Sequence, residues 1–266
     1  MSLLDTRKIR SHVAERAKKA TRVVSAATAD AATKKKTKKE EKTIVEEEHP
    51  IGPAVHAGTR VVLFGTFPPV RKQIRFYYPN PQNDMWNMLG HLFYHDREHF
   101  YVAGASKRTL NEAAILHFAS TSPVGFADHA QRVRRVAGNS SDENIDVLQR
   151  VDVQRDILAA APACEAFIAT GTAALEGLLE MLSALGHFED PAGHIVEVCR
   201  VGRGGRVRTV VPPLGEGYVW RPGAQSGMTH SLRIYRAPST SRALPMPLEA
   251  KEGFYRTFFA SHLHLA

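Results

Sequence analysis

Short apolar runs alternate along the chain with longer segments of helical period. Residues 60–64 form a nearly continuous apolar run that ends at Gly65, and residues 166–169 form another that ends at Thr170-Gly171. Runs of this length and composition are typical of strands buried on both faces of a sheet. A further strand is expected late in the chain, at residues 232–235.

The segments between these strands carry apolar residues three and four positions apart. Asn83-Asp84 supplies an N-cap, and a helix is predicted from Met85 to Phe93. Further helices are predicted at 107–118, 153–160, 173–185 and 249–262, and a hairpin at 194–211. Strands separated by helices predict an α/β fold, a three-layer α/β/α sandwich with a short, mainly parallel central sheet.

The positive charge of the chain is concentrated near its start. The 266 residues carry 35 Lys+Arg and 27 Asp+Glu, a net charge of +8, and five of these excess charges fall within residues 1–50. We therefore expect residues 1–50 to be a basic tail, largely disordered or partly helical over residues 5–24, and residues 51–266 to form the α/β/α domain. The Lys-rich run at 34–42 suits a solubilising segment, a nuclear address or a nucleic-acid-binding arm.

Composition excludes several classes of protein. With 43% hydrophobic residues, the chain is too apolar to be disordered throughout. No run approaches the roughly eighteen apolar residues of a membrane span, and the N-terminus lacks the apolar stretch of a secretory signal. The two cysteines, Cys164 and Cys199, cannot build a disulfide scaffold. These features predict an intracellular protein, cytoplasmic at the nucleoid in a bacterium or nuclear in a eukaryote.

Two segments that follow predicted strands carry the residues best suited to ligand binding, because ligands of parallel sheets bind beyond the carboxyl ends of the strands. The first runs from Gly65 through Phe67 and Tyr78 to Asn83, and the second spans residues 237–243. Aromatic faces stack on planar rings and amides bind a ring's polar edge, whereas consecutive hydroxyls and an arginine suit phosphate oxygens. Together the segments predict a nucleobase site beside a phosphate-binding loop.

The same two segments resemble signature motifs of the uracil-DNA glycosylase superfamily, and most closely its hypoxanthine-DNA glycosylase-like branch. That branch has a GSFPG-type loop, a YYxHPRNxFW-type stretch and a PSTSPA-type loop. The corresponding sequences in this chain are GTFPP at 65–69, YYPNPQNDMW at 77–86 and PSTSRA at 238–243. Residues 125–129 and 138–142 also resemble the family's segment between the two halves of the sheet, so the resemblance covers about residues 58–260.

The resemblance implies a function and a set of site residues. It implies a monofunctional DNA glycosylase of base-excision repair, which hydrolyses the N-glycosidic bond of a flipped uracil or hypoxanthine and leaves an abasic site. DNA with deaminated bases would be the partner of a monomeric enzyme that uses neither a metal nor an organic cofactor. Asn83 would be the catalytic residue. The other site residues would be base-binding Gly65, Thr66, Phe67, Pro68 and Tyr78, and DNA-binding Ser239, Thr240, Ser241 and Arg242.

Two departures from the superfamily pattern leave a rival interpretation open. Phe67 stands where many members carry the Asp or Asn that positions the hydrolytic water, and Ala237 stands where several carry a His or Asn that stabilises the departing base. The rival is a catalytically weak or inactive nucleic-acid-binding member of the same fold. A small-molecule nucleoside hydrolase is a more distant alternative.

Several of these residues have structural interpretations beside the functional ones. Asn83 can serve as a helix N-cap as well as a catalyst. The histidines at positions 91, 95 and 99 would share one helix face, which suits either a metal or a polar surface. For Asp128 we expect a structural role or a hydrogen bond to the pocket. The arginines within residues 132–135 suit either a DNA-backbone-binding cluster or a solvated helix face.

Overall fold

The computed structural model describes residues 45–70, 73–136, 142–201, 207–263 and 265. Residues from Thr43 onward form one compact unit. The predicted tail helix and the Lys-rich run lie outside the described residues. Among the residues that are described, no helix combines the length and the apolar character that crossing a membrane requires.

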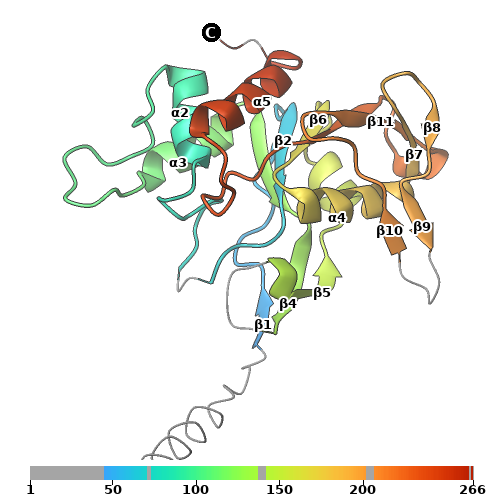
Figure 1. Ribbon diagram of the computed structural model, residues 1–266, viewed down its shortest axis with the longest axis horizontal. Coiled ribbons are helices and arrows are strands. Elements are labelled where there is room, and N and C mark those ends of the chain that lie inside the picture. The colour runs from blue at the N-terminus through green and yellow to red at the C-terminus, as the bar shows by residue number, and fades with distance from the viewer. Residues whose placement is uncertain (1–44, 71–72, 137–141, 202–206, 264, 266) are drawn as a thin grey trace, which may run out of the picture. The chain divides into compact units, whose positions relative to one another are not determined.

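A seven-stranded sheet forms the centre of the described domain, in the order β3-β2-β6-β12-β11-β7-β8 (Figure 1). Its strands, in that order, are β3 (Val124–Asp128), β2 (Val61–Gly65), β6 (Ala166–Ala169), β12 (Leu232–Arg236), β11 (Gly217–Pro222), β7 (Gly186–Glu189) and β8 (Ile195–Val196). The first four run parallel, and the last three extend the sheet with antiparallel pairs. Every residue of β2 and β6 is buried, which explains their continuous apolar sequence.

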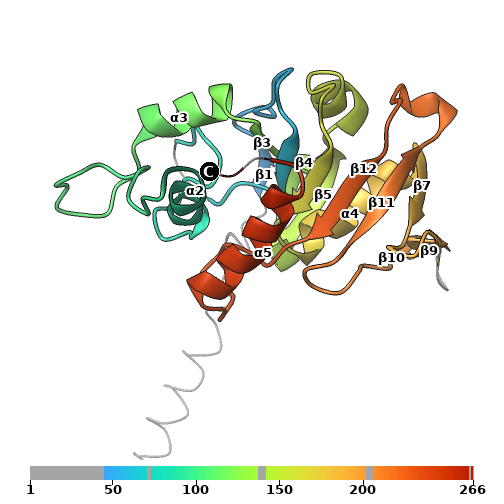
Figure 2. The same ribbon diagram turned by 90° about the horizontal axis from the view of Figure 1, so that it is seen from above.

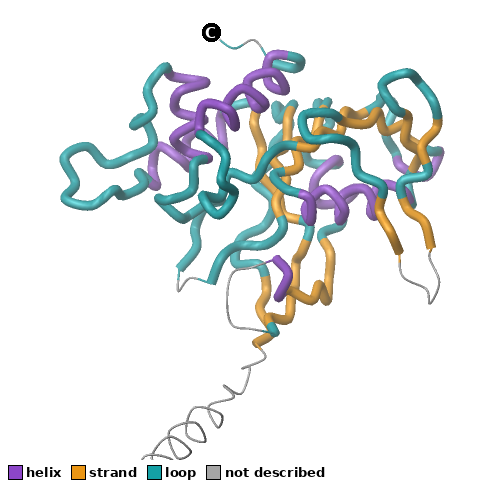
Figure 3. Tube along the Cα trace, viewed as in Figure 1, coloured by secondary structure: helices purple, strands orange, loops and turns teal. Residues whose placement is uncertain are grey.

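Helices cover both faces of this sheet (Figures 2 and 3). They are α2 (Met85–Tyr94), α3 (Glu112–Thr121), α4 (Thr172–Ser183), α5 (Leu248–Ala260), the π-helix η2 (Val153–Leu158) and the short 3-10 turns η1 (Asp142–Asn144) and η3 (Ala224–Ser226). Residues of α2, α3 and α5 share one hydrophobic cluster with Leu63 and Ile168, whereas residues of α4 and η2 share another with Val62 and Phe167. Successive strand residues point to opposite faces, so β2 and β6 feed both clusters. The predicted three-layer sandwich is confirmed.

Two smaller antiparallel sheets accompany the central one. β1 (Val45–Glu48), β4 (Ala130–Arg135) and β5 (Ile145–Arg150) form a sheet in the order β1-β4-β5. β9 (Cys199–Val201) pairs with β10 (Val207–Thr209) as the predicted hairpin, whose turn lies outside the described residues. β1 falls within the span that the sequence assigns to the tail.

Three predicted elements differ from the observed ones. α3 begins at Glu112 rather than at residue 107, because Asn111 caps it and accepts a hydrogen bond from the N–H of Ala114 at 3.2 Å. The helix predicted at 153–160 is a π-helix of six residues. The arginines within residues 132–135 lie on strand β4, where they face a strand of glutamates, rather than on a helix.

Candidate functional site

The two segments that the sequence singles out meet at one edge of the parallel sheet. The carboxyl ends of β2, β3, β6 and β12 lie together there, and a cavity of about 600 Å³ opens beyond them. The predicted site residues that line this cavity are Gly65, Thr66, Phe67, Pro68, Tyr78, Asn83, Ser239, Thr240 and Ser241. Arg242 is not among the lining residues. Loops that are more than 150 positions apart in the sequence therefore enclose one space.

The floor of the cavity lies where β2 and β3 end. Gly65 is paired with Asp128 across these two strands, and a Cβ at position 65 would overlap Asp128 Oδ1. Glycine is required here because only its bare Cα lets the carboxylate approach so closely. The Asp128 side chain is 9% exposed, and its Oδ2 lies 3.0 Å from His49 Nε2. An acidic group is thus buried where β2 and β3 end, in a cavity that aromatic and polar side chains line together.

Tyr78 forms part of the cavity wall in an unusual backbone conformation. Its φ of 53° lies in the left-handed region, which costs a residue other than glycine on the order of 1 kcal/mol. Its hydroxyl donates to Thr170 Oγ1 at 3.1 Å, since the Thr170 hydroxyl itself donates to the Phe64 carbonyl at 3.2 Å. Burial raises the pKa of the Tyr78 phenol, and the charge of Asp128 raises it further. The ring is therefore neutral and firmly placed.

Asn83 caps α2 and still has a free donor. Its Oδ1 accepts the backbone N–H of Met85 at 2.9 Å, whereas Asp84, the N-cap residue by position, makes no side-chain bond to the helix. Within the described part of the chain, Asn83 Nδ2 has no hydrogen-bond partner. The atom that accepts the Met85 N–H must be the amide oxygen of Asn83, so the other end of this amide is the NH₂ group. Asn83 therefore offers a ligand N–H donors.

The serine-threonine loop after β12 is shaped by its own hydroxyls. The N–H of Ser241 donates to Ser239 Oγ, and the N–H of Ala243 donates to Ser241 Oγ, both at 3.2 Å. The N–H of Asp84 donates to the Thr240 carbonyl at 3.0 Å, which joins this loop to the start of α2. The hydroxyls of Ser239 and Ser241 accept these bonds and keep their own protons for donation, as contacts to phosphate oxygens require.

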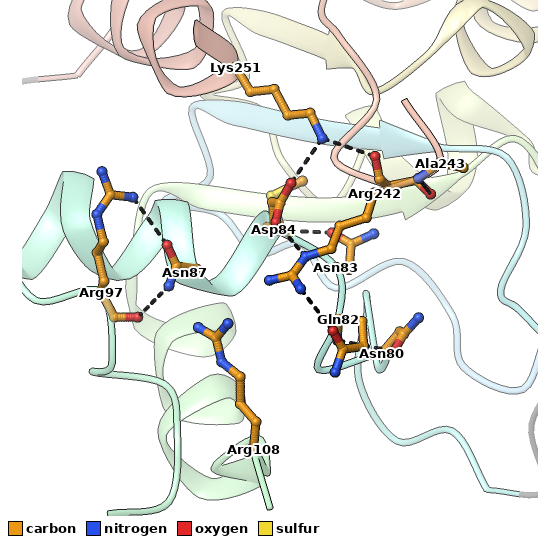
Figure 4. Close-up of polar contacts among 12 residues, drawn as sticks. Asn80, Gln82, Asn83, Asp84, Asn87, Arg97, Arg108, Arg242, Ala243 and Lys251 are labelled. Atoms are coloured by element: carbon orange, nitrogen blue, oxygen red, sulfur yellow. Dashed lines mark hydrogen bonds and ion pairs between the residues drawn. The ribbon is translucent and has the colours of Figure 1, made fainter. Parts of the chain in front are cut away.

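A buried ion pair joins the same two segments (Figure 4). Lys251 on α5 is 1% exposed, and its Nζ donates to Asp84 Oδ2 and to the Ser241 carbonyl, each at 2.9 Å. Arg242 Nε donates to Asp84 Oδ1 at 3.2 Å, and its Nη1 donates to Gln82 Oε1 at 2.8 Å. The structure therefore shows Arg242 connecting the two loops beside the cavity, and its contact with DNA stays a prediction.

Two polar residues that line the cavity, His49 and Asp142, stand out among those that were not predicted as site residues. His49 lies in the span assigned to the tail, where no hydrophobic pattern marks it. Asp142, which the sequence marks only as the end of a family-like stretch, accepts the hydroxyl of Thr66 at 3.2 Å. Partial burial raises the pKa of Asp142; the Thr66 bond opposes this shift, and the charge of Asp128 adds to it.

The three histidines of α2 and the following turn do not gather around a metal position. His91 Nδ1 lies 2.8 Å from Glu252 Oε1, and the ring of His99 stacks on Tyr94 with 3.6 Å between centroids. Across the described ranges, no three His, Cys, Asp or Glu side chains are placed as metal ligands. In these contacts His91 faces a largely buried carboxylate, whose side chain is 7% exposed, and His99 faces an aromatic ring.

The chain matches no known family model and no curated protein. Among solved structures, it is similar to a solution NMR structure of a protein from Methanosarcina acetivorans, which is provisionally described as a uracil DNA glycosylase. The two chains are 16% identical with a TM-score of 0.49, over 82% of this chain and 98% of the other. A likeness at this level is no evidence about activity, which has to be inferred from the residues of the cavity.

Proposed function

We propose that the protein is a monofunctional DNA glycosylase that removes uracil or hypoxanthine from DNA and leaves an abasic site. The observation that carries this proposal is the meeting of the aromatic-amide loop and the serine-threonine loop around one cavity of about 600 Å³. A cavity of this size is typical of small-molecule sites, and aromatic walls suit a planar base. The resemblance of both loops to glycosylase motifs supports the same chemistry.

The base would reach the cavity by leaving the duplex. Its glycosidic carbon is inaccessible while the base is stacked, and extrusion costs a few kcal/mol, least at a mismatch. Deaminated bases are mismatched and therefore favoured. Phe67 and Tyr78 would stack on the extruded ring, while Ser239 and Ser241 would donate to the phosphates that flank it.

Asp128, at the floor of the cavity, would distinguish bases by the protonation of one ring nitrogen. Deamination converts the N3 acceptor of cytosine into the N3–H donor of uracil, and the N1 acceptor of adenine into the N1–H donor of hypoxanthine. A carboxylate offers acceptors only, so Asp128 would bind the N–H of either product. Cytosine and adenine would instead place a ring-nitrogen lone pair against the carboxylate. Two acceptors that face each other without a proton are unfavourable in a buried site, so these bases should be rejected.

Cleavage of the glycosidic bond places negative charge on the departing base and positive charge on the sugar. The Asn83 N–H donors would stabilise the departing base and orient the water that attacks the sugar carbon. One positioned donor of this kind contributes roughly 10²–10³-fold to the rate. Because an amide is a poor base, we assign to Asp142, which borders the cavity beside Thr66, the stabilisation of the sugar cation and the acceptance of the water proton.

Catalytically weak nucleic-acid binding is the second candidate function. Ala237 is 1% exposed and offers the cavity no polar side chain at the position where several superfamily members stabilise the departing base. Phe67 likewise supplies no water-positioning group. The same loops would then bind an extruded base without cleaving it efficiently.

The test uses oligonucleotides with one uracil or one hypoxanthine, followed by alkali to cut abasic sites. Wild-type protein should release both bases. Asn83→Asp keeps the oxygen that caps α2 but loses the N–H donors, so activity should fall roughly 10²–10³-fold while thermal stability stays near that of the wild type. Asn83→Ala should lose the cap as well, at about 1 kcal/mol.

Two outcomes would contradict the proposal. Salt-sensitive DNA binding with no cleavage above the Asn83→Ala background would favour the weakly catalytic relative. Cleavage of free nucleosides that does not depend on Ser239 or Ser241 would favour a nucleoside hydrolase.

A further inference from the structure

Strand β1 lies outside the seven-stranded sheet, and His49, the residue that follows it, lines the cavity. It pairs antiparallel with β4, with Glu47 opposite Val133. Just beyond the strand, the backbone N–H of His49 donates to the Gln131 carbonyl at 2.7 Å. This pairing holds His49 beside Phe67 in the loop that follows β2, and it holds Glu47 beside the buried Arg135.

His49 touches the floor and an aromatic wall at once. Its side chain is 7% exposed, and its Nδ1 accepts the backbone N–H of Ile51 at 3.3 Å. The ring proton is therefore on Nε2, which donates to Asp128 Oδ2 at 3.0 Å. This bond fixes one carboxylate oxygen and leaves Oδ1 as the acceptor for a ligand. The ring also lies edge-on to Phe67, with 5.4 Å between centroids.

Glu47 acts on Phe67 through Arg135. The Arg135 side chain is 1% exposed, its Nε donates to Glu47 Oε1 at 2.9 Å, and its Nη2 donates to the Pro68 carbonyl at 2.6 Å. The guanidinium carbon lies 5.3 Å from the centroid of the Phe67 ring. A cation buried so fully depends on its polar partners, among which Glu47 supplies a carboxylate. Glu47 thus keeps Arg135 in place, and Arg135 holds the Phe67-Pro68 segment.

We propose that strand β1 is a positioning element of the base-binding cavity: His49 orients Asp128, and His49 and the Glu47–Arg135 pair together fix Phe67. This proposal rests on the function proposed above. Glu47 and His49 are positioning residues, because each acts through a residue that would touch the base. Misplacing a group of an active site by about 1 Å can cost on the order of 10²-fold in rate, so the effect is measurable.

The variants separate hydrogen bonding from packing. His49→Gln keeps an N–H donor for Asp128, whereas His49→Met fills similar space without one. Glu47→Gln keeps an acceptor for Arg135, whereas Glu47→Ala removes it. Glu46→Ala is the matched control, because Glu46 lies on the same strand and pairs with Arg134 at 2.8 Å, but both side chains are at least 41% exposed.

Two readouts are measured on the full chain. The first is kcat and KM on the uracil oligonucleotide, where His49→Met and Glu47→Ala should lower kcat by roughly 10²-fold and change KM much less. His49→Gln and Glu47→Gln should restore most of the rate. The second is the ¹⁹F spectrum of 4-fluorophenylalanine placed at position 67, which should be one narrow line in the otherwise wild-type chain and broad or split in His49→Met and Glu47→Ala. Glu46→Ala should leave both readouts unchanged.

The proposal is overturned if His49→Met and Glu47→Ala keep the wild-type kcat and the narrow ¹⁹F line. It is also overturned if His49→Gln loses as much activity as His49→Met, because hydrogen bonding to Asp128 would then be irrelevant. Should wild-type protein cleave no DNA, the proposed function fails, and the ¹⁹F spectra alone decide whether β1 fixes Phe67.

Discussion

The ion pair between Lys251 and Asp84 makes a strong prediction about stability. Both side chains are at least 91% buried, and Lys251 Nζ also donates to the Ser241 carbonyl. Lys251→Met removes the charge and both hydrogen bonds while keeping much of the side-chain volume. We expect the variant to be destabilised and to lose activity, because the pair joins the loop of Asn83 to the loop of Ser239.

The size of the expected loss in stability depends on which cations still contact Asp84 in Lys251→Met. Removing one partner of a buried ion pair costs about 3–5 kcal/mol, since the other charge is left without compensation. Arg242 Nε still lies 3.2 Å from Asp84 Oδ1, and its side chain is 52% exposed. A half-solvated cation compensates only in part, so we place the loss near the lower limit, at about 3 kcal/mol. For a domain of this size that corresponds to a fall of roughly 6–12 °C in Tm.

Urea unfolding and thermal unfolding measure this loss directly. Asp84→Asn/Lys251→Met should be less destabilised than Lys251→Met, because the double variant removes both buried charges. Arg60→Met breaks a pair with Glu165 whose side chains are 37–38% exposed, so it should lose about 1 kcal/mol or less. A Lys251→Met variant that loses no more than Arg60→Met would show that the pair does not hold the two loops together.

Two further predictions concern pH. If Asp142 acts as a carboxylate, activity is lost as the pH falls through its pKa. Because that pKa is raised, the loss of activity in acid should occur at higher pH than for an ordinary aspartate. Asp142→Asn should lower the rate at pH 7 and abolish this loss in acid, and a pH–rate profile that the substitution leaves unchanged would show that Asp142 takes no part in the mechanism. Burial, with the Arg150 charge, lowers the pKa of His129 to about 4. As the pH falls, the imidazole of His129 is therefore protonated in the unfolded chain at a higher pH than in the folded chain. The free energy of unfolding should fall by about 3 kcal/mol between pH 6.5 and 4. His129→Phe removes the titrating imidazole, so this variant should unfold in urea with a weaker pH dependence over this range.

The centre of the sheet was predictable because burial on both faces leaves a continuous apolar run. β2 and β6, which are buried throughout, lie within one residue of their predicted positions. β12 was placed as closely, although its residues alternate at first between buried and exposed. β3 has no such run, because Gly125 interrupts it. A Cβ at Gly125 would overlap the side chains of Thr59 and Val55. Glycine is therefore required by close packing against residues distant in the sequence, and the local sequence pattern does not indicate this packing.

The site was predictable where it follows strands and unpredictable where it depends on register. Loops that follow parallel strands gather at one edge, so Phe67, Asn83 and Ser239 could be placed together from the sequence. The floor needs β2 and β3 to pair with Gly65 opposite Asp128. A shift of one residue would turn the Asp128 side chain to the other face of the sheet, and composition does not fix that register.

Strand β1 escaped prediction for a different reason. Its sequence, Val-Glu-Glu-Glu, has no apolar alternation, and β4 is rich in arginine, so each segment by itself resembles a solvated charge run. In the structure the two runs pair, with Glu46 opposite Arg134 and Glu48 opposite Arg132. Opposite charges across a strand pair stabilise a sheet much as apolar pairs do. The determinant of β1 is therefore a complementary segment more than 80 residues away, and only the folded chain reveals that this acidic stretch carries His49 to the cavity.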